Sequence, residues 1–192
     1  MLGKSINSKS LLVNSCLFIS STLTLSFFLP SFLLVSPAVA IRLNNGQVAF
    51  NNSPRLIRSA ASFISSNTPA TYQFTISVPK DAGESLEAVT IMQQPNVEKI
   101  SFDLNQNRAF KGKSFAGGPA LHLANIGGPK PRSNKVTVVF NPPVAPGNTV
   151  TVELRAKHNP KFGVYLFGVT AYPAGEKGIG QFLGYGRLHF YK

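Results

Sequence analysis

Acidic residues and histidines are the side chains with which residues 41–192 of this chain could carry out acid–base or metal chemistry. Two carboxylates held roughly 5–9.5 Å apart hydrolyse glycosidic bonds. Asp81, Glu84 and Glu87 lie close together around an expected turn, where solvated acids are common. Glu153 and Glu176 each stand near a basic residue with which an exposed acid can pair. A hydrolase acting on cell-envelope polymers is therefore an alternative interpretation, and the sequence singles out no catalytic residue.

The three histidines, His122, His158 and His189, are separated by 36 and 31 residues. Common zinc and copper sites draw on more closely spaced ligands, and Met92 is the single methionine of residues 41–192. None of the histidines lies near the pattern that positions a serine nucleophile. We expect no metal and no cofactor, we expect His189 to face outward, and we keep a metal-binding protein as a second alternative.

Aromatic residues are dense near the end of the chain, and no tryptophan is present. They are Tyr165, Phe167, Tyr172, Phe182, Tyr185, Phe190 and Tyr191. Sugar rings stack on aromatic faces, but the interior of a β-sandwich is also built largely from aromatic side chains, so we expect most of this set in the core. Tyr172 and Tyr185 differ because each neighbours a proline or glycine turn, and they are predicted to stand at the rim of a binding site.

Positive charge is concentrated in the second half of the chain. Residues 41–103 carry five basic and five acidic residues, whereas residues 104–192 carry twelve basic and two acidic residues, a net charge of +10. Such a field favours anionic partners, and we expect an acidic envelope polysaccharide or an anionic lipid surface. Nucleic acid is not expected, because no recognisable nucleic-acid-binding module accompanies the charge. The candidate ligand-binding cations are Arg108, Lys111, Lys113, Lys130 and Arg132.

The elements that position these residues are predicted to be strands. Residues 71–78 alternate apolar and polar side chains, which is typical of a half-buried strand. Residues 88–92 and 97–104 are predicted to be two further strands, joined as a hairpin by the turn at Pro95 and Asn96. Residues 135–140 and 148–154 are expected to form another pair, and residues 164–172 and 182–191 a last pair.

Two segments are harder to interpret. Residues 53–64 fit one face of a short helix as well as an irregular strand. Residues 108–132 contain repeated Gly, Lys and Pro and are expected to form a long exposed basic loop, with a short strand at residues 120–123. Short strands separated by Gly, Pro and Asn predict an all-β fold, a single antiparallel β-sandwich that is immunoglobulin-like or a related Greek key.

The first forty residues resemble a secretory signal peptide. Lys4 and Lys9 precede a mainly apolar segment that ends in small residues up to Ala40, where we expect cleavage. The single cysteine, Cys16, would leave with this segment, so residues 41–192 contain no thiol. We expect residues 41–192 to form a single domain that is exported to the periplasm, the medium or the thylakoid lumen.

The later part of the chain resembles a family of uncharacterised exported proteins from cyanobacteria. The resemblance rests on residues 140–155, 159–160, 163–176 and 180–191, and upstream on residues 54–56, 79–84 and 102–110. Its most specific part runs from Gly163 to Glu176, where aromatic and glycine positions interleave. The resemblance implies a compartment and a group of source organisms but no reaction. Taken with the charge, the sequence predicts a non-catalytic binding or interaction protein of the cell envelope or the extracellular space.

Overall fold

The computed structural model describes residues 41–42, 46–113, 117–127 and 134–192, all within the compact unit 36–192. The strands are β1 (Ile41–Arg42), β2 (Val48–Ala49), β3 (Arg55–Ala61), β4 (Ala70–Ser77), β5 (Leu86–Gln93), β6 (Arg108–Lys111), β7 (Leu123–Gly127), β8 (Lys135–Val144), β9 (Thr149–Ala156), β10 (Gly163–Pro173) and β11 (Gln181–Phe190). A single turn of 3-10 helix, η1 (Leu104–Gln106), follows β5. Within these ranges, no helix has the length and apolar composition needed to cross a membrane. The predicted signal peptide lies outside the described residues.

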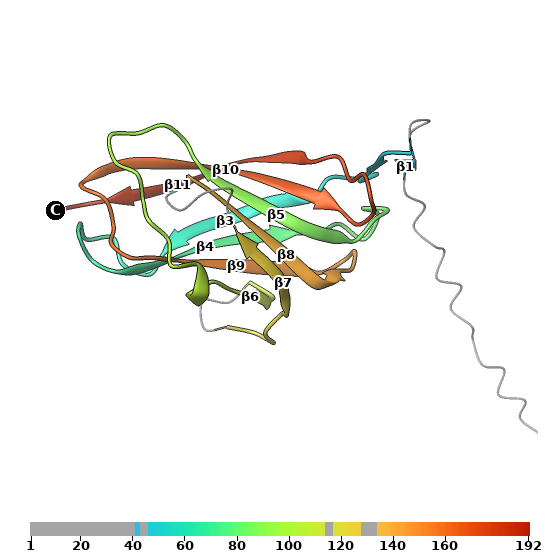
Figure 1. Cartoon of the computed structure of the whole chain (residues 1–192), viewed down its shortest axis with the longest axis horizontal. Helices are drawn as coiled ribbons and strands as arrows, with labels where there is room; N and C mark the ends of the chain where they lie inside the picture. Colours follow the sequence, from blue (N-terminus) through green and yellow to red (C-terminus); the bar gives the residue numbers. More distant parts are fainter. Residues whose placement is uncertain (1–40, 43–45, 114–116, 128–133) are drawn as a thin grey trace, which may run out of the picture. The chain divides into compact units, whose positions relative to one another are not determined.

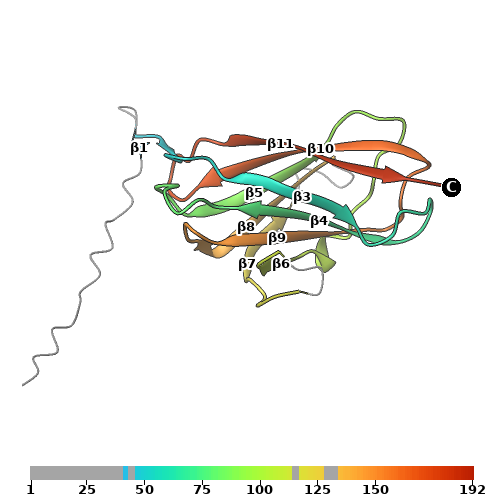
Figure 2. The same cartoon turned by 180° about the vertical axis from the view of Figure 1, so that it is seen from behind.

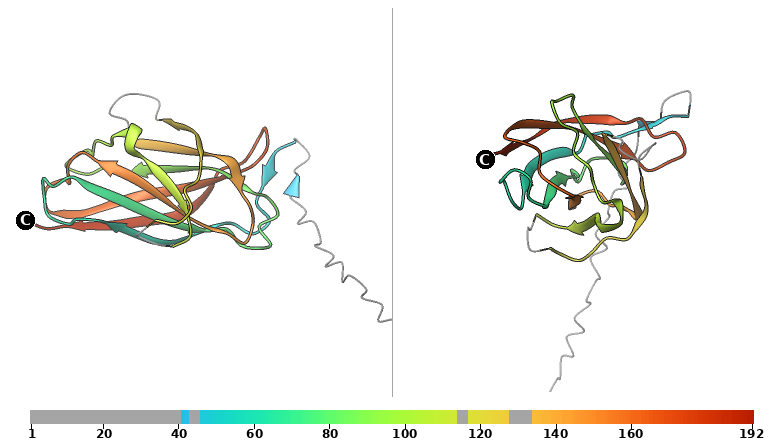
Figure 3. Two further views of the ribbon diagram at one scale, coloured as in Figure 1. Left: turned by 90° about the horizontal axis from the view of Figure 1, so that it is seen from below. Right: turned by 60° about the vertical axis from the view of Figure 1, so that its left-hand side comes forward.

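Two antiparallel sheets pack face to face (Figure 1 and Figure 2), and Figure 3 shows the two layers from further directions. One sheet has five strands in the order β11-β10-β5-β8-β7, and the other has four strands in the order β3-β4-β9-β6. The orders β3-β4-β9-β6 and β11-β10-β5 correspond to the two sheets of an immunoglobulin constant-type domain. The predicted antiparallel β-sandwich is therefore confirmed.

The core lies between the sheets and follows the predicted alternation. On β4, Tyr72, Phe74 and Ile76 are fully buried and belong to the central cluster. Strand β9 lies beside β4 in register, with Leu154 opposite Tyr72 and Val152 opposite Phe74. Paired residues on neighbouring strands point to the same face, so the apolar rows of both strands enter the same core.

Strand β3 settles the ambiguity over residues 53–64. It pairs with β4 along most of its length, and the register shifts between Leu56 and Arg58. This irregularity interrupts the strict alternation of a strand, which explains why the local pattern also fitted a helix. The β3 edge also approaches β11, where the Ser59 hydroxyl accepts a hydrogen bond from the Arg187 amide at 3.1 Å.

The predicted strand at residues 97–104 and its hairpin turn are wrong. This segment is an irregular stretch held against the end of β5 by a side chain, because Gln93 accepts a hydrogen bond from the Ile100 amide at 2.9 Å and donates one to the Glu98 carbonyl. Farther on, the Asp103 carboxylate accepts from the Asn105 amide and caps η1. Polar side chains here satisfy backbone groups that a sheet would otherwise use.

The predicted pairing of residues 135–140 with residues 148–154 is also wrong, although both strands exist. Strand β8 pairs with β5 and β7, whereas β9 pairs with β4 and β6. The proline-containing connection crosses from one sheet to the other, so two strands that are neighbours in sequence lie in different layers. By contrast, the predicted pair of residues 164–172 with residues 182–191 is confirmed as β10 and β11.

Much of the expected long loop at residues 108–132 consists of strands. Residues 108–111 form β6 at the edge of the four-stranded sheet, and residues 123–127 form β7 at the edge of the five-stranded sheet. The predicted strand at residues 120–123 is reduced to an isolated bridge between Phe110 and Ala120 and the first residue of β7. Edge pairing was not visible locally because each of these strands pairs with a distant segment.

Candidate functional site

An extra residue in β11 places two aromatic rings on the outer face of the five-stranded sheet. Along the β10–β11 ladder, Gly168 lies opposite Tyr185 and Thr170 lies opposite Phe182. Between these pairs β10 has one residue and β11 has two, so β11 contains one extra residue. At this bulge Gly184 has a φ of +117°, a conformation that glycine adopts readily. The bulge shifts the alternation by one residue, so Phe182 and Tyr185 emerge on the same side of the sheet. Their ring centroids are 5.0 Å apart at an interplanar angle of 69°.

These rings surround a depression whose floor is the backbone of Gly168. A Cβ atom at this position would lie 3.3 Å from Cε2 of Phe182 and 3.6 Å from Cε1 of Tyr185. Tyr172, two residues beyond Thr170 on β10, forms the third aromatic wall. We call this depression, with a volume of about 220 Å³, the aromatic hollow. Its lining residues are Thr90, Met92, Gln94, Lys135, Gly168, Thr170, Tyr172, Phe182 and Tyr185.

The aromatic hollow combines exposed apolar surface with a few polar groups. Phe182 and Tyr185 are 57% and 55% exposed. Thr90, which lines the hollow, shares a hydrogen bond of 2.9 Å with the hydroxyl group of Thr137 on β8, and Lys135 also belongs to the lining. Exposed rings beside a small number of polar groups are characteristic of small-molecule and saccharide sites.

A second depression, of about 400 Å³, adjoins the aromatic hollow and shares Thr90, Lys135 and Tyr172 with it. We call it the acidic hollow, because both Glu87 and Glu176 line it. One oxygen of Glu87 accepts a hydrogen bond of 3.2 Å from the Gly175 amide. The outer face of the five-stranded sheet therefore carries two neighbouring hollows of different polarity.

Glycine packing fixes the ring of Tyr172 between these hollows. A Cβ atom at Gly180 would lie 2.5 Å from Cε1 of Tyr172, which is closer than any side chain could approach. The tyrosine ring thus lies flush against the backbone that leads into β11. We infer that Gly180 is required for the position of Tyr172.

The predicted site residues fall into two separate places. Tyr172 and Tyr185 come together in the aromatic hollow. Arg108 and Lys111 lie instead on β6 in the other sheet, opposite Glu153 and Val150 of β9. Since residues three apart on a strand point to opposite faces, these two cations do not share a surface.

The remaining predicted cations add little to a single binding patch. Lys113 is exposed just beyond β6, and Lys130 and Arg132 lie outside the described residues. The three histidines are all exposed, and His189 faces outward from β11 as expected. Among the described residues, no group of three His, Cys, Asp or Glu side chains is arranged to hold a metal ion.

The outer face of the four-stranded sheet is polar but internally bonded. Thr75 and Thr151 are buried there, and their hydroxyl groups lie 3.0 Å apart. The Thr151 hydroxyl also donates to the Gly112 carbonyl at 2.8 Å. Beside them, the buried amide of Gln73 donates to the carboxylate of Glu153, so this acid, an earlier candidate for catalysis or for pairing with a cation, is bonded to an amide.

Sequence reasoning missed Phe182 and Gly168 as site residues. Phe182 was grouped with the core aromatics, and of that group Tyr165, Phe167 and Phe190 are indeed buried. One local signal was available: a glycine inside a strand often marks a bulge. Gly184, between two aromatic residues three positions apart, predicts that both rings can face outward.

The fold and the hollows define a class: a two-sheet antiparallel β-sandwich with an exposed aromatic depression on one sheet. More particularly, the chain belongs to the family described as "Protein of unknown function (DUF2808)", whose model matches residues 47–190. The predicted membership of an uncharacterised family is thereby confirmed, and cyanobacterial origin stays a prediction. Comparison with curated proteins yields no match.

Several solved structures are similar to this one at low sequence identity. An uncharacterized protein from Nocardia farcinica with an immunoglobulin-like fold is 14% identical, with 70% of this chain and 97% of that chain covered and a TM-score of 0.43. The group B streptococcus pilus 2b backbone protein is 10% identical, with 66% and 56% covered and a TM-score of 0.41. The collagen-binding domain from a Staphylococcus aureus adhesin is 9% identical, with 69% and 100% covered and a TM-score of 0.37.

Proposed function

We propose that this protein is an exported, non-catalytic binding protein that holds an acidic polysaccharide of the cell envelope or the extracellular space against the outer face of its five-stranded sheet. The observation that carries the proposal is the aromatic hollow, in which Tyr172, Phe182 and Tyr185 surround a glycine floor. Residues 1–40, which resemble a signal peptide, support export to the periplasm, the medium or the thylakoid lumen.

Ring stacking supplies the contact in this proposal. The C–H faces of a sugar ring pack on the faces of aromatic side chains, and a tyrosine hydroxyl at the rim adds a hydrogen bond. The absence of a side chain at Gly168 lets the Phe182 ring and the Gln94 amide lie close to the backbone of β10, because a Cβ atom there would be 3.3 Å from Cε2 of Phe182 and 3.1 Å from Nε2 of Gln94. Thr90 and Lys135 also line the hollow and would lie beside the same ligand.

Charge supplies the preference for an acidic polymer. Residues 104–192 carry a net charge of +10, and such a field draws polyanions to the protein and speeds their association. Lys135 lines both hollows and is the cation best placed to meet a sugar carboxylate or sulfate. Arg108, Lys111 and Lys113 contribute to the field from the other sheet without touching the ligand.

The proposal is tested by measuring affinity for alginate, which is a uronic-acid polymer, and for dextran, which is neutral. We expect alginate to bind more tightly than dextran, with an affinity that falls as salt rises. The double variant Phe182→Ala/Tyr185→Ala should bind alginate at least tenfold more weakly. Ile57→Ala is the matched control, because Ile57 is a 44% exposed apolar residue on β3. Equal alginate affinity for the double variant and the wild-type protein would refute the proposal.

A hydrolase is the second candidate function, favoured by one observation. Glu87 and Glu176 line the same hollow, next to the proposed saccharide site, and glycosidases use two carboxylates that flank the scissile bond. Incubation with alginate followed by an assay for new reducing ends tests this candidate. Activity abolished by both Glu87→Gln and Glu176→Gln would replace the binding proposal with an enzymatic one.

A further inference from the structure

Exposed apolar side chains gather at the end of the sandwich where the chain terminates. They come from four segments that are far apart in the sequence: the β3–β4 connection, the stretch after β5, the start of β10 and the end of β11. Figure 1 shows these segments at the same end as the C-terminus. We call them the apolar tip, which consists of Phe63, Ile64, Val97, Phe162, Val164 and Tyr191.

The segments of the apolar tip are tied to one another by hydrogen bonds. The Tyr191 amide donates to the Ile64 carbonyl at 2.9 Å, which joins β11 to the β3–β4 connection. The side-chain amide of Asn96 donates to the Val164 carbonyl at 2.8 Å, which joins the stretch after β5 to β10. The segments of the apolar tip are therefore held together and do not form independent loops.

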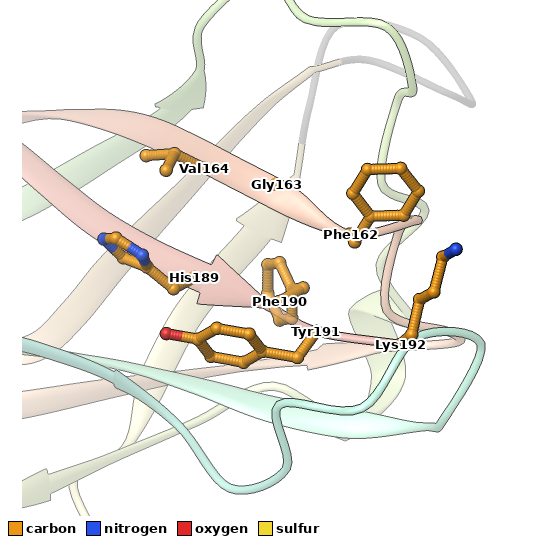
Figure 4. A pocket seen from close by; sticks show the side chains of 7 residues that line it. All are labelled: Phe162, Gly163, Val164, His189, Phe190, Tyr191 and Lys192. Atoms are coloured by element: carbon orange, nitrogen blue, oxygen red, sulfur yellow. The ribbon is translucent and has the colours of Figure 1, made fainter.

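These side chains are well exposed for their size. Val97 is 94% exposed, Phe162 is 61% exposed and Tyr191 is 57% exposed. Figure 4 shows Phe162 and Lys192 side by side near the ends of β10 and β11, with the Tyr191 ring running back toward His189, around a hollow of about 330 Å³. Contiguous exposed apolar surface on a protein marks a place where another molecule binds.

Lysine side chains accompany the apolar tip. Lys99, Lys161 and Lys192 are exposed on these segments and Lys157 is exposed just after β9, and Glu98 is the single acidic residue among residues 62–69, 96–99, 157–164 and 189–192. The side chains of these segments thus carry four positive charges and one negative charge, a net charge of +3. Lys192 Nζ lies 5.3 Å from the centroid of the Phe162 ring. Lys161 pairs with Glu98 at 3.7 Å, while its side chain remains 74% exposed.

We propose that the apolar tip docks on a membrane surface that contains anionic phospholipids. The apolar side chains enter the boundary between headgroups and acyl chains, and the lysines reach back to the headgroup phosphates. This is the combination of buried apolar area and attraction to anionic lipid that holds proteins at a bilayer surface. Long lysine side chains suit this position, because their stems cover apolar surface while their amino groups stay in the polar layer.

Charge favours a membrane over a second copy of this chain as the occupant. Two copies joined tip to tip would bring together two surfaces that each carry a net charge of +3, and like charges at close range oppose association. An anionic bilayer instead offers negative charge and apolar depth together. Lipid docking also leaves the aromatic hollow accessible, since Gly168 lies four residues along β10 from Val164, about 13 Å in a strand.

The test is co-sedimentation of the purified protein with vesicles of two compositions. We expect binding to vesicles of equal parts phosphatidylcholine and phosphatidylglycerol, and at least tenfold weaker binding to phosphatidylcholine alone. Val97→Asp should weaken binding to the mixed vesicles at least tenfold, and it leaves folding intact because Val97 is almost fully exposed. Phe162→Ala is a second variant with the same expected direction. Phe182→Ala/Tyr185→Ala, at the aromatic hollow, is the control and should bind vesicles like the wild-type protein.

Three results would overturn the lipid proposal. The first is equal binding to the two kinds of vesicle, and the second is vesicle binding unchanged by Val97→Asp. The third is a dimer in sedimentation-velocity experiments that Val97→Asp converts to a monomer, because the tip would then be covered by a second copy. The polysaccharide proposal rests on other residues, so it can fail or succeed independently of this one.

Discussion

The outer faces of the two sheets differ in what their side chains contact. On the four-stranded sheet, Thr75 and Thr151 face outward but are buried and hydrogen-bonded to each other. On the five-stranded sheet, Phe182 and Tyr185 face outward and remain more than half exposed. On the four-stranded sheet, the outward polar groups are hydrogen-bonded within the protein. On the five-stranded sheet, outward apolar side chains remain exposed to water.

Under the proposed function, this difference separates a face that serves stability from a face that serves binding. Buried hydroxyl and amide groups stabilise a fold only when they are paired, as they are on the four-stranded sheet. Exposed aromatic rings contribute little to folding and are retained where a ligand covers them. Substitutions on the four-stranded face should therefore change stability, and substitutions in the aromatic hollow should change affinity.

The largest expected effect is on the four-stranded face. Thr151→Val removes a hydroxyl that bonds both Thr75 and the Gly112 carbonyl, which leaves the buried Thr75 hydroxyl and the half-buried Gly112 carbonyl without this partner. We expect the free energy of unfolding to fall by about 2–3 kcal/mol, with no change in alginate affinity. Urea denaturation measures the first quantity, and Thr137→Val on the other sheet is the control, with a smaller expected loss. A loss of alginate affinity in folded Thr151→Val protein would contradict the division of roles.

Filling the aromatic hollow should lower the affinity for alginate more than it lowers the stability of the fold. In Gly168→Val, the new side chain meets Phe182 and Tyr185 and occupies the floor, so alginate affinity should fall at least tenfold, or about 1.4 kcal/mol. Stability should fall by only about 1 kcal/mol, because the new side chain must displace the Gln94 amide and the exposed Phe182 ring, whose nearest atoms lie 3.1 Å and 3.3 Å from its Cβ atom. Calorimetric titration of this variant measures the change in alginate affinity, and thermal unfolding measures the change in stability. Undiminished affinity would place the ligand elsewhere.

A weaker effect should come from the core side of the four-stranded sheet. Burial, with a smaller contribution from Tyr165, raises the pKa of the Tyr72 hydroxyl far above its ordinary value of 10.0. The unfolded chain therefore loses this proton at a lower pH than the folded protein, so stability holds below pH 10 and falls above it. We expect a loss of about 1 kcal/mol between pH 10 and pH 11 from this residue.

Tyr72→Phe is the matched variant for the pH test. It removes the titrating group and also the 2.9 Å hydrogen bond to Asn159, so it should be less stable at neutral pH but show a shallower decline at high pH. Denaturant unfolding at several pH values from 8 to 11 compares the two proteins. Identical slopes for both would show that Tyr72 does not control the decline.

The smallest expected effect is at Arg108. This exposed residue on β6 lies opposite Glu153, and surface substitutions of this kind change stability by less than about 0.5 kcal/mol. Arg108→Ala should leave the unfolding free energy within that range and slightly reduce the salt dependence of alginate binding. A loss of affinity as large as that of Gly168→Val would move the binding face to the four-stranded sheet.

Local patterns were sufficient to predict some strands and not others. The strand at residues 71–78 was correctly predicted, and so was the aromatic-rich strand pair β10 and β11. Both predictions rest on side-chain alternation and turn residues, which are local properties of the sequence. The pairing of β8 with β9 was wrong, since the choice of sheet depends on contacts with β4 and β5, which no short segment encodes. The alternation of residues 97–104 predicted a strand that does not form, because the side chain of Gln93 bonds to their backbone in place of a neighbouring strand.

Only some residues of the candidate site could be predicted from the sequence. Tyr172 and Tyr185 were singled out from their neighbouring turns, and the structure places both in the aromatic hollow. Phe182 could not be assigned to a face by counting alternate residues, because the bulge at Gly184 changes the count. The apolar tip was missed for another reason: its residues come from four segments that only the tertiary structure brings together.

The bulge at Gly184 also has a consequence for reading related sequences. A relative one residue shorter between the positions of Phe182 and Tyr185 would have a regular strand there, and both aromatic side chains would still face outward, because residues two apart on a strand share a face. A relative of unchanged length that lacked the bulge would instead turn one of the two rings inward and lose one wall of the hollow. The spacing of the two aromatic positions, read together with the glycine between them, therefore offers a genetic marker that sorts family members into those that can display both rings and those that cannot.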